Sequence, residues 1–531
     1  MTYTNPILTG FHPDPSIIRV GKDYFLATST FEWFPGVQIF HSTDLVNWEL
    51  VARPLDSVEK LDMRGVPDSC GVWAPCLSYD QGTYYLVYSN VKSFDGMCKD
   101  TPNYLVMAKH IEGPWSAPIF LNASGFDGSL FHDEDGKKYY LSMLVDHRHG
   151  KFFGGIVLQE YDSKKKCLVG RVHHIYEGSP LGITEGPHLY KRDGYYYLLT
   201  AEGGTEYGHA VSLARSKNLL GPYETHPQNP LISAAKDPEH PLQKTGHGDC
   251  VWTESGNCYI VFLTGRPLSK LGRCTLGRET AIEKLYWPEG EWPFLEGNTS
   301  FPRTYIPELP SKKEGPFQEK VRFEEGIPPS YQSLRISTSE DWILREQNPG
   351  FLTLLGQESL SSTFSQSLLA RRVQHFHCSY TICMEFSPNS FQHMAGLVCY
   401  YNTGHHYYLH MTNKGIEGEG KVLRLSKTDN FAYSELLDPA IDLPTGKIHL
   451  RVIWDRDKLR FSYKVEEANW IEISKAYDGS ILSDDYVRDG SDRYRPAFTG
   501  AFLGICCQDL TGNKHPAHFE WADYQELTVD L

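Results

Sequence analysis

Five related segments recur within the first 270 residues, and this repeat restricts the possible folds more than any other feature. Each segment opens with a polar or aromatic residue, continues into an apolar strand, and reaches a second, aromatic strand through a glycine-containing turn. The openings are DPSII from Asp14, WAPCL from Trp73, DGSLF from Asp127, EGPHL from Glu185 and HGDCV from His247, at spacings of 59, 54, 58 and 62 residues. Each length accommodates four short strands, and such units bury their faces only against their neighbours. The repeat therefore predicts a five-bladed β-propeller.

The innermost strand of each blade lines the axis of a propeller, so the five opening residues are expected to converge on one ring. That ring would hold Asp14, Trp73, Asp127, Glu185 and His247. Three carboxylates in one concavity disfavour folding, because burial and like charges raise their pKa values. A functional site explains this set better than stability does.

Asp14 is also held between Pro13 and Pro15, which restrict the backbone on both sides of it. By itself, this Pro-Asp-Pro turn would suit a corner at the start of a strand. Together with the repeat, it indicates a carboxylate that is aimed into the shared funnel.

Composition excludes several classes of protein. Aromatic residues make up 13% of the chain, and 46 Gly with 32 Pro supply turns, which favours a β-rich fold. The formal net charge of −15 argues against a nucleic-acid partner. No apolar run approaches the roughly 20 residues of a membrane helix, and the first residues lack a secretory signal, so we expect no membrane association and a cytoplasmic location. The 12 cysteines are scattered without metal-type spacing, which predicts reduced thiols.

The predicted ring suits the hydrolysis of a glycosidic bond, which needs one protonated acid and one ionised carboxylate. A third carboxylate beside the acid can keep it protonated near neutral pH, which gives Asp127 a role of its own. Trp73, with Phe31 and Trp33 of the FEWFPG loop, would supply aromatic faces for a sugar ring. That loop is equally consistent with simple packing.

Several motifs resemble glycoside hydrolase family 43, and in particular its two-domain β-xylosidases. They are HPDPS at 12–16, STFEWFPGVQIFHSTDLVNW at 29–48, WAPCLSY at 73–79, FDGSLFHD at 126–133, TEGPHLY at 184–190, LGRETAI at 276–282 and NSFQHMAGLVCYYNT at 389–403. The resemblance runs essentially from end to end. It implies an inverting mechanism with Asp14 as general base, Glu185 as general acid, and Asp127 as the residue that raises the pKa of the acid and orients it.

The same resemblance assigns further residues. Arg278 of LGRET matches a position that hydrogen-bonds sugar hydroxyls in the deepest subsite, with a buried ion-pair partner as the alternative. His247 matches a channel histidine that in some members orders a calcium ion or water, so it is a candidate metal contact and a candidate structural residue. No cofactor is expected to be required, with Ca²⁺ in the channel as a candidate. Relatives often associate, which makes a homo-oligomer an expectation.

The remaining sequence predicts a second domain. Residues 1–306 would form the propeller, 307–320 (PELPSKKEGPFQEK) a linker, and 321–531, rich in alternating strands, a β-sandwich of jelly-roll, concanavalin-like type. The resemblance implies that a loop of this sandwich covers the active site with Phe498 of AFTGAF, which would make the enzyme exo-acting. The alternatives are that Phe498 is a core strand residue and that the sandwich is an independent carbohydrate-binding module.

The expected reaction is release of xylose from the non-reducing end of β-1,4-linked xylo-oligosaccharides, with α-L-arabinofuranosidase as a candidate second activity. Open alternatives are a mainly arabinofuranoside-cleaving enzyme, a retaining hydrolase, and a non-catalytic carbohydrate-binding propeller. Two departures from the family pattern bear on substrate range: the segment 266–280 is short, and Val145 stands where some relatives carry tryptophan.

Overall fold

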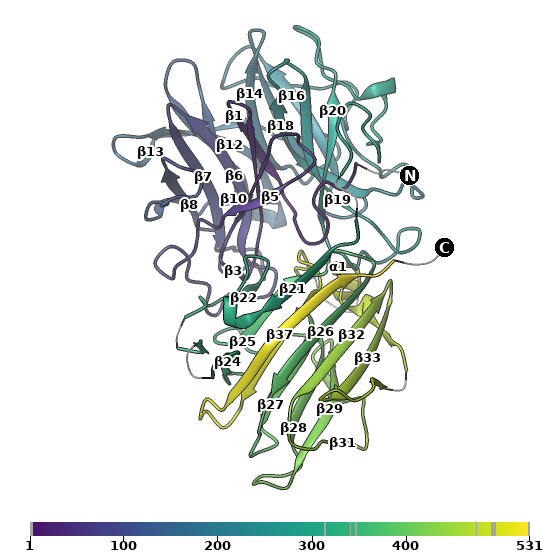
Figure 1. The fold of residues 1–531 in the computed structure, drawn as a ribbon. Coiled ribbons are helices and arrows are strands. Elements are labelled where there is room, and N and C mark those ends of the chain that lie inside the picture. Colours follow the sequence, from purple (N-terminus) through teal and green to yellow (C-terminus); the bar gives the residue numbers. More distant parts are fainter. Residues whose placement is uncertain are drawn as a thin grey trace. The chain divides into compact units, whose positions relative to one another are not determined.

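The chain forms two compact units, shown as a computed structural model in Figure 1. The structure describes residues 4–312, 315–339, 341–345, 348–473, 475–489 and 495–528. The first unit comprises Met1–Leu61, Cys70–Leu271 and Arg278–Lys313, and the second Asp62–Ser69, Gly272–Gly277 and Glu314–Leu531. The predicted domain bounds stay a prediction, and two short segments of the predicted propeller, 62–69 and 272–277, belong to the second unit.

The first unit contains five small antiparallel sheets in chain order, which are the blades of the predicted propeller (Figure 1). Blade 1 is β1 (Ser16–Val20), β2 (Asp23–Thr28), β4 (Gln38–Ser42) and β5 (Glu49–Ala52), with the two-residue β3 (Trp33–Phe34) between β2 and β4. Blade 2 is β6 (Gly71–Asp80), β7 (Thr83–Val91), β8 (Asn103–Ala108) and β9 (Ile119–Asn122). Blade 3 is β10 (Gly125–His132), β11 (Lys138–Asp146), β12 (Phe152–Asp162) and β13 (Cys167–Tyr176). Blade 4 is β14 (Glu185–Arg192), β15 (Tyr195–Glu202), β16 (Ala210–Ser216) and β17 (Glu224–Thr225), and blade 5 is β18 (Gln243–Trp252), β19 (Cys258–Gly265) and β20 (Glu279–Leu285).

The tight turn between the first two strands of each blade explains the glycine in every repeat. Gly21, Gly82, Gly136, Gly194 and Gly256 occupy these turns, with φ values of 65, 73, 84, 77 and 83°. This left-handed conformation is the one in which the absence of a Cβ favours glycine. The repeated glycines are therefore a requirement of the hairpins.

Blade 5 differs from the predicted pattern of four strands per repeat, because its described sheet has three strands. The chain start lies beside the last of these strands: Leu8 and Thr280 form an antiparallel bridge, and the backbone N–H of Ile7 donates to the Thr280 carbonyl at 2.9 Å. The N-terminal segment thus links the first and last repeats, which closes the ring.

The hydrophobic core of the first unit lies between neighbouring blades. One cluster joins Leu26 of blade 1 to Val261 of blade 5, and another joins Tyr197 of blade 4 to Phe262 of blade 5. All four side chains are fully buried. A blade therefore buries its faces against the adjacent blades, as the repeat analysis assumed.

The second unit is a β-sandwich of two antiparallel sheets (Figure 1). One sheet has the order β23 (Ile343–Leu344), β24 (Leu352–Leu355), β37 (Pro516–Glu526), β26 (His377–Glu385), β32 (Ile448–Asp455), β33 (Lys458–Val465) and β34 (Ile471–Glu472), with β21 (Gln318–Arg322) on β37 and β35 (Tyr477–Asp478) on β33. The other has the order β22 (Gln332–Leu334), β25 (Ser367–Arg372), β36 (Phe502–Asp509), β27 (His393–Asn402), β28 (His405–Asn413), β29 (Lys421–Asp429) and β30 (Ala432–Glu435), with β31 (Ile441–Asp442) on β29.

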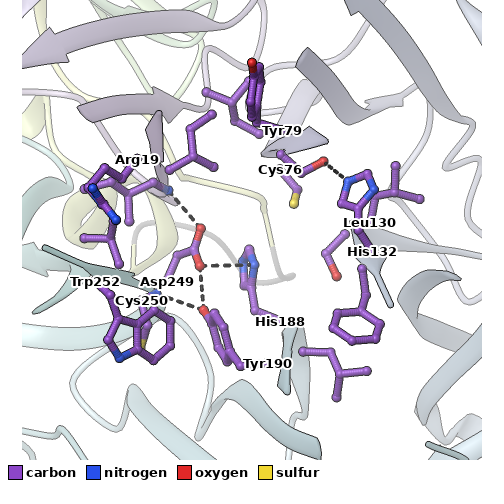
Figure 2. Close-up of a pocket in the computed structure, with 18 residues that line it drawn as sticks. Arg19, Cys76, Tyr79, Leu130, His132, His188, Tyr190, Asp249, Cys250 and Trp252 are labelled. Atoms are coloured by element: carbon purple, nitrogen blue, oxygen red, sulfur yellow. Dashed lines mark hydrogen bonds and ion pairs between the residues drawn. The ribbon is translucent and has the colours of Figure 1, made fainter. Parts of the chain in front are cut away.

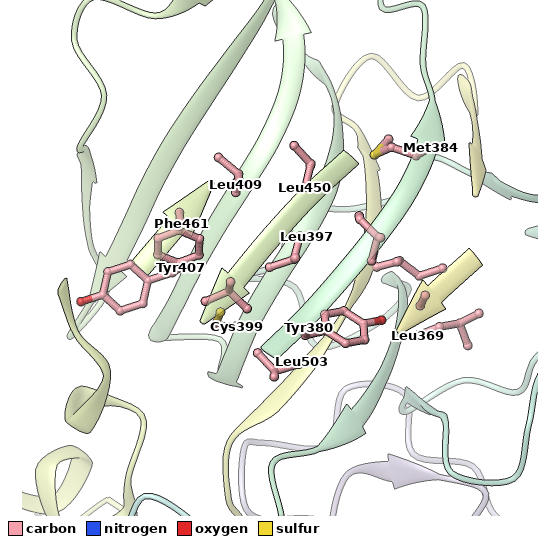
Figure 3. Packing of buried hydrophobic residues seen from close by; sticks show 14 of the residues in the cluster. Leu369, Tyr380, Met384, Leu397, Cys399, Tyr407, Leu409, Leu450, Phe461 and Leu503 are labelled. Atoms are coloured by element: carbon pink, nitrogen blue, oxygen red, sulfur yellow. The ribbon is translucent and has the colours of Figure 1, made fainter. Parts of the chain in front are cut away.

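The inward faces of the two sheets form one core, part of which is shown in Figure 3. Leu369, Leu397 and Leu503 come from one sheet and Tyr380 and Leu450 from the other, and all five have no exposed surface. The alternating pattern of the strands therefore buries one side of each sheet against the other.

Helical structure is confined to short segments in the described part of the chain. These are α1 (Asp484–Asp489) and the 3₁₀ turns Arg148–Gly150, Glu296–Asn298, Phe323–Glu325 and Gly479–Ile481. Among the described residues, none of these helices has the length and apolar character to cross a membrane. The 12 cysteines are free thiols, and 10 of them are buried.

Candidate active site

The opening residues of the repeats lie at irregular points of the innermost strands. The register of these strands shifts between Trp73 and Cys76, between Phe126 and Ser129, between Glu185 and His188, and between Gly246 and Gly248. Left-handed φ values occur at the same openings: Asp14 (53°), Ala74 (34°), Asp127 (55°), Gly186 (57°) and His247 (44°). Bulges of this kind change the direction of a side chain. They explain why small residues or proline accompany each opening residue.

His247 brings two of the predicted acids together. Its Nδ1 lies 4.0 Å from Asp14 Oδ1 and 3.8 Å from Asp127 Oδ2, and all three side chains are at least 90% buried. Burial lowers the pKa of His247 to about 4, although the Asp14 charge acts in the opposite direction. A neutral imidazole thus separates two carboxylates at neutral pH.

Glu185 completes this acidic cluster through its neighbour in sequence. The backbone N–H of Gly186 donates to Asp127 Oδ2 at 3.1 Å. Burial, followed by the charge of Asp14, raises the pKa of Glu185 to about 8, and Arg278 opposes this. Burial and the charges of Glu185 and Asp14 raise the pKa of Asp127 well above its usual value. Repulsion between two acids is mutual, so the pair holds a proton near neutral pH.

Thr205 and Ser29, which the sequence did not indicate, hydrogen-bond to the charged groups Arg278 and Asp14. Arg278, 5% exposed, lies 3.7 Å from Asp14 Oδ1 and donates from Nη1 to Thr205 Oγ1 at 2.8 Å. Ser29 donates to Asp14 Oδ2 at 2.7 Å. The ion-pair alternative for Arg278 is therefore present in the structure, and its contact with sugar hydroxyls stays a prediction. Nothing in the local sequence marks Thr205 or Ser29, because their partners are distant in sequence or across a hairpin.

The predicted aromatic residues are near one another. The rings of Phe31 and Trp73 are 6.0 Å apart between centroids, and the Arg278 guanidinium carbon lies 5.5 Å from the centroid of Phe31. Trp73 also contacts Phe94 and Phe126, at 4.9 and 5.3 Å. Trp33 has no exposed surface, which agrees with the alternative of simple packing for this loop, and its part in a sugar-binding face stays a prediction.

The roles of Phe498, of the segment 266–280 and of Val145 stay predictions. Phe498 belongs to the second unit, where its side chain is buried and its backbone N–H donates to Ser69 Oγ at 3.0 Å. It is not a strand residue, in contrast to the alternative considered above. Within the segment 266–280, Gly272–Gly277 belong to the second unit, and Arg273 donates to Ser480 Oγ at 2.6 Å. Val145 pairs with Phe153 of β12.

A metal role for His247 gains no support from its surroundings. Within the described ranges of the chain, no group of three or more His, Cys, Asp or Glu side chains is arranged to hold a metal ion. Calcium prefers six to eight oxygen ligands. The residues around His247 therefore do not form a calcium cage by themselves, and the predicted contact stays a prediction.

A cavity of about 350 Å³ lies farther along the same innermost strands (Figure 2). Its lining includes Asp249, which accepts from Tyr190 Oη at 2.5 Å and lies 3.5 Å from His188 Nδ1. Ser16 Oγ and the Ile17 N–H also donate to Asp249, at 2.9 and 2.8 Å. This carboxylate therefore accepts three hydrogen bonds, from Tyr190, Ser16 and Ile17.

A propeller with a ring of acids, followed in the chain by a β-sandwich, defines a class of carbohydrate-cleaving protein, and comparison with known families agrees. Residues 3–293 match the model of "Glycosyl hydrolases family 43", and residues 320–525 match "Beta xylosidase C-terminal Concanavalin A-like domain". The chain belongs to glycosyl hydrolase family 43.

Similar proteins extend over the full length. A "Beta-xylosidase" of Bacillus subtilis (strain 168) is 48% identical, covering 99% of this chain and 100% of the relative. "Xylosidase/arabinosidase 43B" of Humicola insolens is 47% identical, with 98% and 97% covered. The crystal structure of a xylan beta-1,4-xylosidase from Bacillus Halodurans C-125 has a TM-score of 0.93 and 49% identity, with 99% and 100% covered. The predicted family and all-β fold are confirmed.

Proposed function

We propose that this protein is an inverting, exo-acting β-xylosidase that releases xylose from the non-reducing end of β-1,4-linked xylo-oligosaccharides. The observation that carries the proposal is the cluster of three acids near His247. In this cluster Glu185 has a pKa of about 8, and Asp14 Oδ1 lies 3.7 Å from Arg278 Nη1 and 4.0 Å from His247 Nδ1. Relatives named for β-xylosidase activity over the full chain length support the substrate.

In this reaction each acid has one task. Asp14 takes a proton from water, and the oxygen of that water bonds to the anomeric carbon from the face opposite the leaving group. Glu185, protonated below about pH 8, gives its proton to the leaving oxygen as the glycosidic bond breaks. Asp127 holds Glu185 in place through the Gly186 N–H and disfavours its ionisation.

The decisive experiment combines a variant with two leaving groups. Glu185→Gln keeps the shape of the acid but cannot donate a proton, so we expect kcat/KM for xylobiose to fall by about 10² to 10⁴. The loss for 4-nitrophenyl β-D-xyloside should be smaller, because 4-nitrophenolate leaves without protonation. Equal losses for both substrates would contradict the acid role. Proton NMR of the first product should show the α-anomer of xylose, and the β-anomer would indicate retention.

The mainly arabinofuranoside-cleaving alternative has one observation in its favour, the xylosidase/arabinosidase names of relatives. Rates on 4-nitrophenyl β-D-xyloside and 4-nitrophenyl α-L-arabinofuranoside compare the two activities directly. We expect the xyloside to be the better substrate, and a dominant arabinoside rate reverses the assignment. Xylobioses of β-1,4 and β-1,3 linkage test the bond, since a Vibrio relative 42% identical is named "Xylan 1,3-beta-xylosidase".

A non-catalytic binding propeller is the alternative from another class. A protein of that kind has no use for a carboxyl group that burial and a second acid keep protonated at neutral pH. It would bind xylobiose without producing xylose, which product analysis on xylobiose tests. Covering of the site by Phe498, association into homo-oligomers and a cytoplasmic location are further parts of this proposal, with the support given by the sequence.

A further inference from the structure

Asp14 has a hydrogen-bond partner directly across its hairpin. β1 and β2 pair with Ser16 opposite Ala27, and continuing this register places Asp14 opposite Ser29. The backbone confirms this proximity, because the Ser29 N–H donates to the Pro13 carbonyl at 3.1 Å. Ser29 Oγ lies 2.7 Å from Asp14 Oδ2, and Ser29 has no exposed surface.

The direction of this hydrogen bond is determined by a third group. The backbone N–H of Ala74 donates to Ser29 Oγ at 2.7 Å. An ionised carboxylate only accepts, so the single hydroxyl proton of Ser29 is directed to Asp14 Oδ2. The Ala74 N–H thus donates to Ser29, and Ser29 donates to Asp14. These two hydrogen bonds link the opening of blade 2, beside Trp73, to the base in blade 1.

The two oxygens of Asp14 consequently have different surroundings. Oδ2 accepts the buried hydroxyl of Ser29, whereas Oδ1 faces Arg278 Nη1 at 3.7 Å and His247 Nδ1 at 4.0 Å. Both of these distances exceed that of a hydrogen bond. Oδ1 is thus the oxygen directed toward the ring of acids.

We propose that Ser29 is a positioning residue for the general base: it anchors Asp14 Oδ2 and leaves Oδ1 to take the proton from the attacking water. The proton passes from water to Oδ1 and the water oxygen bonds to the anomeric carbon, while the glycosidic bond of that carbon breaks and its leaving oxygen takes the proton of Glu185. This inference rests on the proposed function, in which Asp14 is the base. In this role Ser29 acts through Asp14, which its hydroxyl contacts directly.

Ser16, two residues after Asp14 in the sequence, is a matched control for Ser29. Ser16 is also fully buried; its Oγ donates to Asp249 Oδ2 at 2.9 Å and accepts from the Leu77 N–H at 3.0 Å. Ser16 therefore has the same kind of partners as Ser29, a buried aspartate and a backbone N–H of blade 2. Replacing either serine with alanine leaves a buried N–H without its acceptor, so both changes should lower the melting temperature.

Only one of these changes should affect the reaction. Ser29→Ala is expected to lower kcat by about 10- to 100-fold, because a misplaced base loses its alignment with water, with KM unchanged within about twofold. The loss should be the same for xylobiose and 4-nitrophenyl β-D-xyloside, since water attacks in both cases. Ser16→Ala should keep kcat within about twofold. Ser29→Thr, which retains the hydroxyl, should restore most of the rate.

A double-mutant comparison separates this inference from the proposed function. If Ser29 acts through Asp14, adding Ser29→Ala to Asp14→Ala should not lower the residual hydrolysis of the activated substrate further. An additional 10-fold loss in that background, or equal kcat losses for Ser29→Ala and Ser16→Ala, would overturn the positioning role. Full activity of Asp14→Ala would instead overturn the assignment of the base, whatever Ser29→Ala does.

Discussion

Replacing Glu185 with glutamine should stabilise the folded protein while it abolishes proton donation. The pKa of this carboxyl rises from 4.5 to about 8 in the folded chain, chiefly through burial and the charge of Asp14. Ionised Glu185 is therefore less favourable in the folded state than in the unfolded state. Glutamine has nearly the same shape and no charge, so the variant avoids this penalty.

The size and sign of the effect follow from proton linkage. Below pH 4.5 the group is protonated in both states and has no effect. Between pH 4.5 and 8 the folded state binds more protons than the unfolded state, so stability falls as pH rises. Each pKa unit corresponds to about 1.4 kcal/mol, so the penalty reaches about 3 kcal/mol at pH 7 and at most about 5 kcal/mol above pH 8. Glu185→Gln should remove it.

Thermal unfolding of both proteins from pH 4.5 to 9 tests this reasoning. We expect melting temperatures to coincide at pH 4.5 and the variant to melt several degrees higher at pH 8. Glu202→Gln is a matched control: this buried glutamate of the same blade accepts at Oε1 from the Ser179 N–H at 2.9 Å and from Thr184 Oγ at 3.1 Å, and at Oε2 from the Ser179 hydroxyl. An amide nitrogen cannot accept the bond to Oε2, so this replacement should destabilise the fold. A gap between wild type and Glu185→Gln that is zero or independent of pH would refute the argument.

Three further predictions concern other parts of the molecule. For xylobiose, kcat/KM of the wild type should fall tenfold per pH unit above about pH 8, because Glu185 loses its proton; a flat profile up to pH 9.5 would contradict this. Arg278→Lys should lower kcat/KM by about 10- to 100-fold, because an ammonium does not reproduce the geometry of a guanidinium that reaches both Asp14 and Thr205, and steady-state kinetics will show this. Leu450→Ala, in the core of Figure 3, should cost about 2 to 5 kcal/mol in urea unfolding, and a cost below 1 kcal/mol would indicate a loosely packed core.

The parts of the fold that the sequence predicts are those set by local rules. The glycine turns and the strand openings recur at regular spacing, and periodicity alone leads from them to the propeller. The convergence of Asp14, Asp127 and His247 follows from the same repeat, because equivalent positions of a closed ring must meet at its axis.

Contacts between distant residues were beyond the reach of this reasoning. Thr205 meets Arg278 across 73 positions, and Ser29 receives its second bond from Ala74 in another blade. Neither contact leaves a local pattern. Trp33 shows the converse, since an aromatic residue in a candidate binding loop looks the same in sequence whether its ring faces a ligand or the interior. Its burial is a tertiary property.

The deeper layer of the axis explains how the first unit tolerates a destabilising ring of acids. Asp249 of blade 5 accepts hydrogen bonds from Ser16 of blade 1 and Tyr190 of blade 4, and Ser16 in turn accepts from Leu77 of blade 2. These hydrogen bonds connect blades 1, 2, 4 and 5 around the Asp249 carboxylate. A buried carboxylate with this many donors stabilises the folded state, whereas Glu185 opposes it. Because the two layers are adjacent on the same strands, the hydrogen bonds around Asp249 join the blades next to a ring of acids that opposes folding.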